Sequence, residues 1–423
     1  METKALYTPE LRFPEFSGDW QVKTLGECFE MLQNNTLSRA ELNDKSGDYQ
    51  NVHYGDVLIK YGSILDLSKE QLPYINNNNV AEKYEKSLLK DGDVIIADTA
   101  EDETVGKCTE IINVGEKKII SGLHTIPIRP TIDFAKCFIG LYFNSNVWHS
   151  QLLRIMQGTK VSSISKSQLK NISVCFPTLL EQRKIAACLL SLDNLITHTR
   201  NKVDLLKQHK KGLMQKLFPK SGCNVPELRF HEFSGDWETK KFGDLIVEVS
   251  EKTNNTINTP LYSLTIEDGI TTKTERYERN FLITKTDNSF KIVHQNHFVS
   301  NPMNLRFGAI GYNKNEFDVC VSAYYDVFKF KAEESVSFWI NYLKSNFMLK
   351  EYDKIAIGSL VEKRRVHFSN LQKMQILVPS LTEQRKIADC LTSIDKAIEE
   401  TENKVNLLEK HKKGLVQKMF VKM

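Results

Sequence analysis

The chain has 423 residues, enough for two or three domains, and its 41% hydrophobic and 26% charged residues are typical of globular proteins. This composition excludes disordered and fibrous classes. The net charge of +4 permits nucleic-acid binding without requiring it. The eight cysteines are scattered without a C-x-x-C pair, which predicts reduced thiols. No apolar run approaches the roughly 18 residues of a membrane helix. We therefore expect a soluble, cytoplasmic protein without membrane contact.

The first predicted element is a short lead-in, which later recurs. Residues 11–20 read LRFPEFSGDW and residues 228–237 read LRFHEFSGDW, with nine of ten positions identical. Trp20 and Trp237 are expected to be core residues of the two lead-ins rather than platforms for stacking bases.

A first variable segment, residues 21–160, follows the lead-in. Short apolar runs at 56–59 and 93–97 predict strands, each opened by a turn at Gly55 or Gly92. Helical spacing near residues 134–153 is anchored by Trp148. The acidic residues 101–103 are interpreted as a solvated turn. This segment is large enough to form a mixed domain with its own core.

Two long repeated blocks predict helices. Residues 181–218 and 383–420 match at 25 of 38 positions, and their apolar residues are spaced by alternating four and three, the period of a coiled-coil seam. Thr178-x-x-Glu181 and Ser380-x-x-Glu383 predict capping boxes at the two helix starts. Four polar seam positions either fix the helix register or are merely tolerated, and the pattern favours neither reading: Thr199, Thr401, Lys210 and Lys412.

The second variable segment, residues 238–360, shares almost no sequence identity with the first. A strand is expected at 319–321 and helical structure near 337–352, anchored by Trp339. His294 and His297 are spaced for a shared helix face, but without a third ligand they do not predict a metal site.

Motifs of catalysis are missing from the sequence. We find no nucleotide-binding P-loop, no G-x-G-x-x-G dinucleotide fingerprint and no G-x-S-x-G nucleophile elbow. The chain is therefore expected to have no catalytic site of its own.

The order of variable and repeated segments resembles the DNA specificity subunits of type I restriction–modification systems. The resemblance covers essentially the whole chain and is carried by the paired LRF-x-EFSGDW lead-ins and the paired EQRKIA…HKKGL helices. Weaker support comes from Gly55-Asp56-Val57-Leu58, Gly92-Asp93-Val94-Ile95, Gly158-Thr159 and Gly358-Ser359. The second variable segment departs from the pattern because it lacks an obvious GD-V-L copy.

The resemblance implies an α+β fold in which two similar mixed α/β target recognition domains alternate with two long helices that pair as an antiparallel coiled coil. We expect target recognition domain 1 at 1–177, the central helix and linker at 178–222, target recognition domain 2 at 223–379, and the C-terminal long helix at 380–423. Each domain would read one half of a split target in double-stranded DNA.

The resemblance also implies partners. The helices would set the spacing of the half-sites and dock two methyltransferase subunits, with up to two motor-nuclease subunits in the same complex, directing adenine methylation and DNA cleavage. S-adenosylmethionine, ATP and magnesium would be bound by those partners and not by this chain.

Candidate DNA contacts are loop residues with basic, amide or hydroxyl groups, since these bind phosphates and base edges. The first segment contributes Lys60, Tyr61, Ser63, Arg154, Gln157, Thr159 and Lys160. The second contributes Thr272, Lys273, Arg276, Asn304, Arg306, Lys363, Arg364 and Arg365.

Two other functional classes make different predictions. A coiled-coil adaptor that binds only proteins would show no salt-dependent affinity for DNA. A self-contained nuclease or methyltransferase would need a nucleotide or methyl-donor loop, and the sequence contains none that we identify.

Overall fold

The computed structural model describes residues 7–158, 162–254, 256–272, 290–331, 336–360 and 364–422. By its internal packing the chain divides into two compact units, one of Met1–Thr199 with Asn403–Met423 and one of Arg200–Glu402. Within the described ranges, no helix combines the length and apolar character needed to cross a membrane.

Unit 1 contains a mixed domain followed by the start of a long helix. Its strands are β1 (Gln21–Thr24), β2 (Phe29–Met31), β3 (Leu42–Asn43), β4 (Tyr49–Val52), β5 (Ile64–Asp66), β6 (Tyr74–Ile75), β7 (Val94–Ala97), β8 (Thr99–Ala100), β9 (Cys108–Ile112), β10 (Lys118–Ser121), β11 (Thr125–Pro130), β12 (Ser162–Ser163) and β13 (Ser173–Phe176). Its helices are α1 (Leu25–Cys28), η1 (Arg39–Glu41), α2 (Tyr54–Ile59), α3 (Asn78–Ala81), η2 (Glu82–Ser87), α4 (Phe138–Phe143), α5 (Asn146–Leu152), α6 (Lys166–Leu169) and the long α7 (Leu179–Leu217), which continues into unit 2.

Unit 2 repeats this plan with different loops. Its strands are β14 (Glu238–Lys241), β15 (Ile246–Glu248), β16 (Lys252–Thr253), β17 (Tyr262–Thr265), β18 (Gly269–Thr272), β19 (Phe290–Val293), β20 (Phe298–Ser300), β21 (Ile310–Tyr312), β22 (Val319–Ser322), β23 (Asp326–Phe330) and β24 (Gln375–Val378). Its helices are α8 (Phe242–Leu245), η5 (Leu305–Phe307), α9 (Val336–Leu343), α10 (Asn346–Ile355), α11 (Phe368–Lys373) and the long α12 (Leu381–Met419), which ends in unit 1.

The two domains share a sheet order as well as an element order. In the described residues, β2-β11-β7-β9 of unit 1 corresponds to β15-β23-β20-β21 of unit 2, and β5 extends only the first of these sheets. The antiparallel pair of β1 with β13 corresponds to that of β14 with β24. Unit 1 adds a second sheet, β10-β4-β6-β3, where unit 2 has β16-β19-β22.

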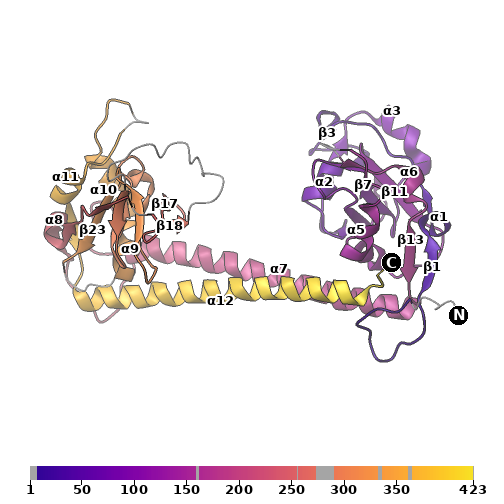
Figure 1. Ribbon diagram of the computed structural model, residues 1–423. Helices are drawn as coiled ribbons and strands as arrows, with labels where there is room; N and C mark the ends of the chain where they lie inside the picture. The colour runs from indigo at the N-terminus through magenta and orange to yellow at the C-terminus, as the bar shows by residue number, and fades with distance from the viewer. Residues whose placement is uncertain are drawn as a thin grey trace. The chain divides into compact units, whose positions relative to one another are not determined.

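One end of each long helix packs against each domain and completes its hydrophobic core. In unit 1 the start of α7 contributes Ile185 and Leu189 to the core, and Phe420, just after α12, packs 5.1 Å from the ring of Tyr142. In unit 2, Phe218 of α7's end lies 5.4 Å from the ring of Tyr342. The two helices are therefore integral parts of both hydrophobic cores (Figure 1).

Within each unit the two helices run antiparallel. In unit 2, Lys207 pairs with Glu402 and Lys210 with Asp395, so the partner number falls as the residue number rises. The seam hydroxyls of Thr199 and Thr401 each donate to a carbonyl four residues earlier in their own helix, which satisfies them without a cross-helix partner.

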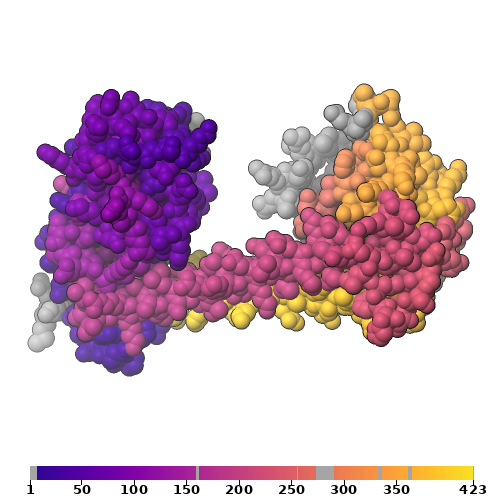
Figure 2. All heavy atoms as spheres, turned by 180° about the vertical axis from the view of Figure 1, so that it is seen from behind, coloured from indigo at the N-terminus to yellow at the C-terminus, as the bar shows by residue number. Residues whose placement is uncertain are grey.

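The lead-ins form hydrogen bonds with the ends of the long helices. Arg12 donates two hydrogen bonds to the carboxylate of Glu181, at 2.8 and 2.7 Å, and the Leu11 amide donates to the Lys418 carbonyl. The lead-in thus ties the start of α7 to the end of α12. In Figure 2 it is the dark indigo segment below the pink start of α7, on the side away from the domain.

Several sequence predictions are confirmed. Strands occur at β7 and β22, helices occur at α4, α5, α9 and α10, and the long helices begin and end close to the repeated blocks. Trp20, Trp148, Trp237 and Trp339 are all buried.

The predicted strand at 56–59 is wrong, because these residues belong to α2. The His53 side chain accepts from the Gly55 amide and caps this helix, and Arg39 holds the Asp56 carboxylate. The GD pair here therefore begins a helix, whereas Gly92, with a φ of 87°, makes the expected turn before β7.

At the second long helix, one of the two hydrogen bonds expected of the predicted capping box is present. The Glu383 amide donates to the Ser380 hydroxyl at 3.3 Å, as a box requires. The Glu383 carboxylate instead accepts from Arg229, just as Glu181 accepts from Arg12. A buried carboxylate that receives a bidentate guanidinium is better satisfied than one that faces an exposed amide.

Candidate nucleic-acid interface

Each domain presents two loops that are joined by main-chain hydrogen bonds at the end of its central sheet. In unit 1, the Ile164 amide donates to the Asp98 carbonyl at 2.9 Å, and Gln157 pairs with Ser163. The first loop is 98–106, between β7 and β9, and the second, after α5, is described at residues 157–158 and 162–163. We call them the paired loops of unit 1.

Unit 2 repeats this construction. The Val366 amide donates to the Pro302 carbonyl at 2.9 Å, and Ile357 pairs with Arg365. The first loop is 302–308, between β20 and β21, and the second, after α10, is described at residues 357–360 and 364–365. These are the paired loops of unit 2, and they occupy the same place in the domain as those of unit 1.

Glycines at equivalent positions explain why the first paired loops of the two units turn in the same way. Gly106 and Gly308 end the first loop of each pair with φ of 86° and 93°. In the second loops the two glycines differ, because Gly158 has a φ of 112° whereas Gly358, with a φ of 159°, is close to extended. The left-handed turn that the two units share is therefore that of Gly106 and Gly308. Only glycine adopts this backbone freely, so the turns persist although the flanking residues differ.

The structure also identifies the counterpart of the GD-V-I turn in the second segment. The Asp93 amide donates to the Lys90 carbonyl, and the His297 amide donates in the same way to His294. Asn296, with a φ of 62°, takes the place of Gly92. Asparagine tolerates the left-handed region, so the turn survives while its sequence signature disappears.

The candidate contacts of unit 1 fall into two groups. Lys60 is exposed and lies 3.3 Å from Glu70, and Arg154 and Gln157 are exposed at the end of α5 and in the second paired loop. Tyr61 is a correction: only 3% of it is exposed, it belongs to the core, and burial raises the pKa of its hydroxyl. It packs the domain and does not face a ligand.

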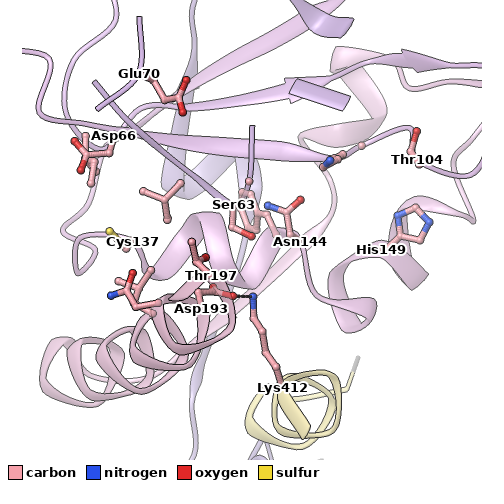
Figure 3. A pocket seen from close by; sticks show the side chains of 18 of the residues that line it. Ser63, Asp66, Glu70, Thr104, Cys137, Asn144, His149, Asp193, Thr197 and Lys412 are labelled. Atoms are coloured by element: carbon pink, nitrogen blue, oxygen red, sulfur yellow. Dashed lines mark hydrogen bonds and ion pairs between the residues drawn. The ribbon is translucent and has the colours of Figure 1, made fainter. Parts of the chain in front are cut away.

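Ser63 lines a cleft of about 800 Å³ between the domain of unit 1 and the helix pair (Figure 3). Thr104, from the first paired loop, and His149, from α5, line the same cleft. On the helix side, Lys412 of α12 forms an ion pair with Asp193 of α7.

Unit 2 has the equivalent cleft, of about 590 Å³, and the equivalent ion pair, with Lys210 contacting both carboxylate oxygens of Asp395 at 2.7 Å. The two seam lysines are therefore used identically, each to join one long helix to the other. This favours the register role over the tolerated one, because a salt bridge across the seam holds only one alignment of the helices.

The candidate contacts of unit 2 separate into exposed and structural residues. Thr272, Asn304 and Arg365 are exposed, the latter two on the paired loops. The guanidinium groups of Arg306 and Arg364 make hydrogen bonds within unit 2, and their contact with DNA stays a prediction.

The side chain of Arg306 is only 7% exposed and donates to Asp353 of α10 at 2.8 Å. Arg364 donates to the same carboxylate and to the carbonyls of Asp353 and Ala356, at the end of α10. Both arginines therefore fasten the paired loops to α10 rather than facing outward.

Five candidates lie outside the described residues: Thr159, Lys160, Lys273, Arg276 and Lys363.

Sequence reasoning missed three exposed apolar side chains on the paired loops of unit 2. Phe307 is 55% exposed, Ile357 is 57% exposed and Leu360 is 56% exposed. Hydropathy would assign all three to a core. The one available signal is Gly308 directly after Phe307, since a left-handed glycine turns the chain at a loop tip.

His294 and His297 lie in the turn between β19 and β20. His294 lies 2.9 Å from both Asp318 and Glu251, one through each ring nitrogen. Burial opposes its charge, but these two hydrogen bonds outweigh burial and raise the pKa of His294. Among the described residues, no group of three or more His, Cys, Asp or Glu side chains is arranged to hold a metal ion.

Comparison with protein families matches residues 17–208 and 234–410 to the type I restriction modification DNA specificity domain. The two matched regions each contain one domain and most of the helix that follows it.

Two relatives from Methanocaldococcus jannaschii are similar in sequence. The chain is 24% identical over 412 residues to a protein designated the type I restriction enzyme MjaX specificity subunit, covering 95% of this chain and 93% of the relative. It is 25% identical over 295 residues to the type I restriction enzyme MjaVIII specificity subunit, covering 65% and 68%.

Solved structures share the fold. The type I restriction-modification system S subunit from M. genitalium superimposes with a TM-score of 0.53 at 12% identity, covering 98% of this chain and all of that chain. A second structure, from a study of complex assembly and conformational transition of the type I R-M system, gives a TM-score of 0.55 at 16% identity, covering 95% and 97%.

Proposed function

This chain belongs to the family of type I restriction modification DNA specificity proteins, and from this premise we propose that each of its domains reads one half of a split double-stranded DNA target through its paired loops. The chain itself performs no chemistry. In this proposal it directs adenine methylation and DNA cleavage by other subunits and acts in the cytoplasm.

The observation that carries the proposal is the equivalence of the paired loops. They have the same main-chain hydrogen bonds in both units, and the first loop of each pair ends in a left-handed glycine, yet the side chains of the two first loops differ. The first loop of unit 1 carries Glu101 and Asp102, whereas the first loop of unit 2 carries Asn304 and Phe307. A fixed scaffold with variable tips is what reading two different base sequences requires.

The helices support the proposed partners. Leu205 and Leu407 occupy equivalent positions of the repeated blocks and are 64% and 67% exposed. Exposed leucines at matching positions fit two copies of one partner. We infer that two methyltransferase subunits dock on the helices and carry S-adenosylmethionine, and that up to two motor-nuclease subunits join with ATP and magnesium. We also infer that the helix lengths set the spacing of the half-sites.

The test is adenine-methylation mapping of a genome in which this chain is co-expressed with its matching methyltransferase subunit. We expect a new split motif, methylated on both strands, that is absent when the methyltransferase subunit is expressed alone. Soluble, associated subunits that produce no motif would contradict the proposal and favour the protein-binding adaptor. Methyl transfer by this chain alone would contradict its non-catalytic role.

A further inference from the structure

The first paired loop of unit 2 ends in a short rigid turn with an unusual outer surface. The Phe307 amide donates to the Asn304 carbonyl at 2.9 Å, which closes η5 as a 3-10 turn. Side chains three residues apart eclipse in such a turn, so Asn304 and Phe307 project from the same side. Leu305, between them, is 1% exposed and points into the core.

Ion pairs with Asp353 of α10 hold this turn in place. Arg306 lies 4.9 Å from the centre of the Phe307 ring and donates to Asp353 of α10. Arg364, from the other paired loop, donates to the same carboxylate. A ring that is 55% exposed would ordinarily be mobile, but here a mostly buried guanidinium fixes the backbone beneath it.

An amide beside an apolar ring matches one feature of DNA in particular. In the major groove an A·T pair presents the adenine N6 and N7 atoms, which bind an asparagine amide, next to the thymine methyl group, which accepts apolar contact. A G·C pair has no methyl group at that position. Arg365, on the second paired loop of unit 2, is also exposed.

Resting on the proposed function, we propose that Asn304 and Phe307 together read one A·T pair in the half-site of unit 2, with Asn304 on the adenine and Phe307 on the thymine methyl group. Arg306, Asp353 and Arg364 are positioning residues that hold the two readers. They act through Phe307 and do not touch the base.

The experiment begins with the motif mapped for the unaltered chain. Duplexes that carry this motif are made with each thymine of the second half-site replaced, one at a time, by uracil, which lacks the methyl group. The full chain in complex with its methyltransferase subunit is then titrated with each duplex. We expect one thymine-to-uracil change to weaken binding about fourfold, the effect of one lost methyl contact.

The variants make the assignment specific. Phe307→Ala should weaken binding by a similar factor and abolish the sensitivity to uracil at that position. Phe307→Leu should retain it in part, and methylation mapping of Asn304→Ala should show relaxation at the same pair. Phe317→Ala removes a ring that is 50% exposed elsewhere in unit 2 and should retain full sensitivity to uracil.

The positioning residues have their own test. Arg306→Ala should lose the uracil sensitivity, and the double variant with Phe307→Ala should lose no more than Phe307→Ala alone, because both act on one contact. Additive losses would show that Arg306 contacts DNA itself and would overturn its assignment.

The failures are distinguishable. A mapped motif whose second half-site has no thymine that responds to uracil, or a Phe307→Ala variant that still responds, would overturn this inference alone. Absence of any motif with the unaltered chain would overturn the proposed function and this inference with it.

Discussion

At the scale of the residue, the arginine of each lead-in has the largest predicted effect on stability. Arg229 is 17% exposed, and its partner Glu383 is 2% exposed. Arg229→Ala would leave a buried carboxylate without its cation, and we expect a loss of about 3 kcal/mol in the free energy of unfolding, measured by denaturant titration.

The exposed Arg385, two residues along α12, provides the matched control, and Arg385→Ala should change stability by less than about 0.5 kcal/mol. Replacing both Arg229 and Glu383 by apolar residues should cost less than Arg229→Ala alone, because no buried charge is then unpaired. An equal loss in both variants would mean that packing, and not charge, dominates.

A second residue-scale prediction concerns His297, which takes the place of Asp93 in the turn before the sheet. Burial lowers the pKa of His297 to about 4 from 6.5, assisted by the charges of His294 and Lys329 and opposed by Asp318 and Glu251. Between these values the unfolded chain binds more protons than the folded chain. Stability from this group is therefore complete above about pH 6.5 and falls as the pH is lowered toward 4.

His297→Gln should flatten the pH dependence of unfolding in this window, measured by thermal melts from pH 7 to 4. The neighbouring His294 has the opposite sign, because its raised pKa favours folding at low pH. A His297→Gln profile that matches that of the unaltered chain would refute the prediction.

Residue types predicted the candidate surface less well than the fold. Basic residues in loops suggested phosphate contacts, but Arg306 and Arg364 both serve Asp353, which lies elsewhere in the sequence. Nothing local distinguishes an arginine that fastens a loop from one that faces a ligand. Phe307 was missed for the converse reason, since an apolar side chain is expected inside.

At the scale of the element, helices and strands with a long sequence pattern were predicted correctly more often than those with a short one. The long helices were predicted because a 3.5-residue period runs unbroken through the repeated block. The run at 56–59 was misread because three apolar residues after Asp56 fit a strand or a helix equally well, and the deciding contact is the cap from His53.

The helix pair carries the element-scale prediction. Inserting one heptad into each long helix, after Asn201 and after Asn403, preserves the seam and adds about 10 Å to each helix, since each residue rises about 1.5 Å. We expect the unread spacer of the methylated motif to lengthen by about three base pairs, at about 3.4 Å each, with both half-sites unchanged.

An insertion of four residues provides the contrast, because it breaks the heptad register and should reduce methylation. An unchanged spacer after the heptad insertion would show that the helices do not set it.

At the scale of the whole molecule, the internal repeat predicted more than any single motif. It indicated that the two domains have the same fold although they share almost no sequence identity. The packing between domain and helices could not be predicted in the same way, because the matching rings lie in the variable segments. Phe138 and Tyr142 contact Phe420, and Phe338 and Tyr342 contact Phe218 in the same manner.

These matched contacts lead to the last prediction, in which the domain of unit 1 is replaced by a second copy of the domain of unit 2. The exchange must include both members of the closing strand pair, since β1 pairs with β13 and β14 with β24. Residues 21–176 would therefore be replaced by residues 238–378, with both lead-ins and both helices kept. The copied Phe338 and Tyr342 would meet Phe420 as Phe138 and Tyr142 do.

We expect this chain to fold and, with its methyltransferase subunit, to methylate a symmetric motif in which the second half-site occurs twice in inverted orientation. Methylation mapping reads the outcome directly. An exchange of residues 21–160 alone would separate β1 from β13 and should fold less well, which provides the control for the boundary. A motif that retains the original first half-site would contradict the assignment of one half-site to each domain.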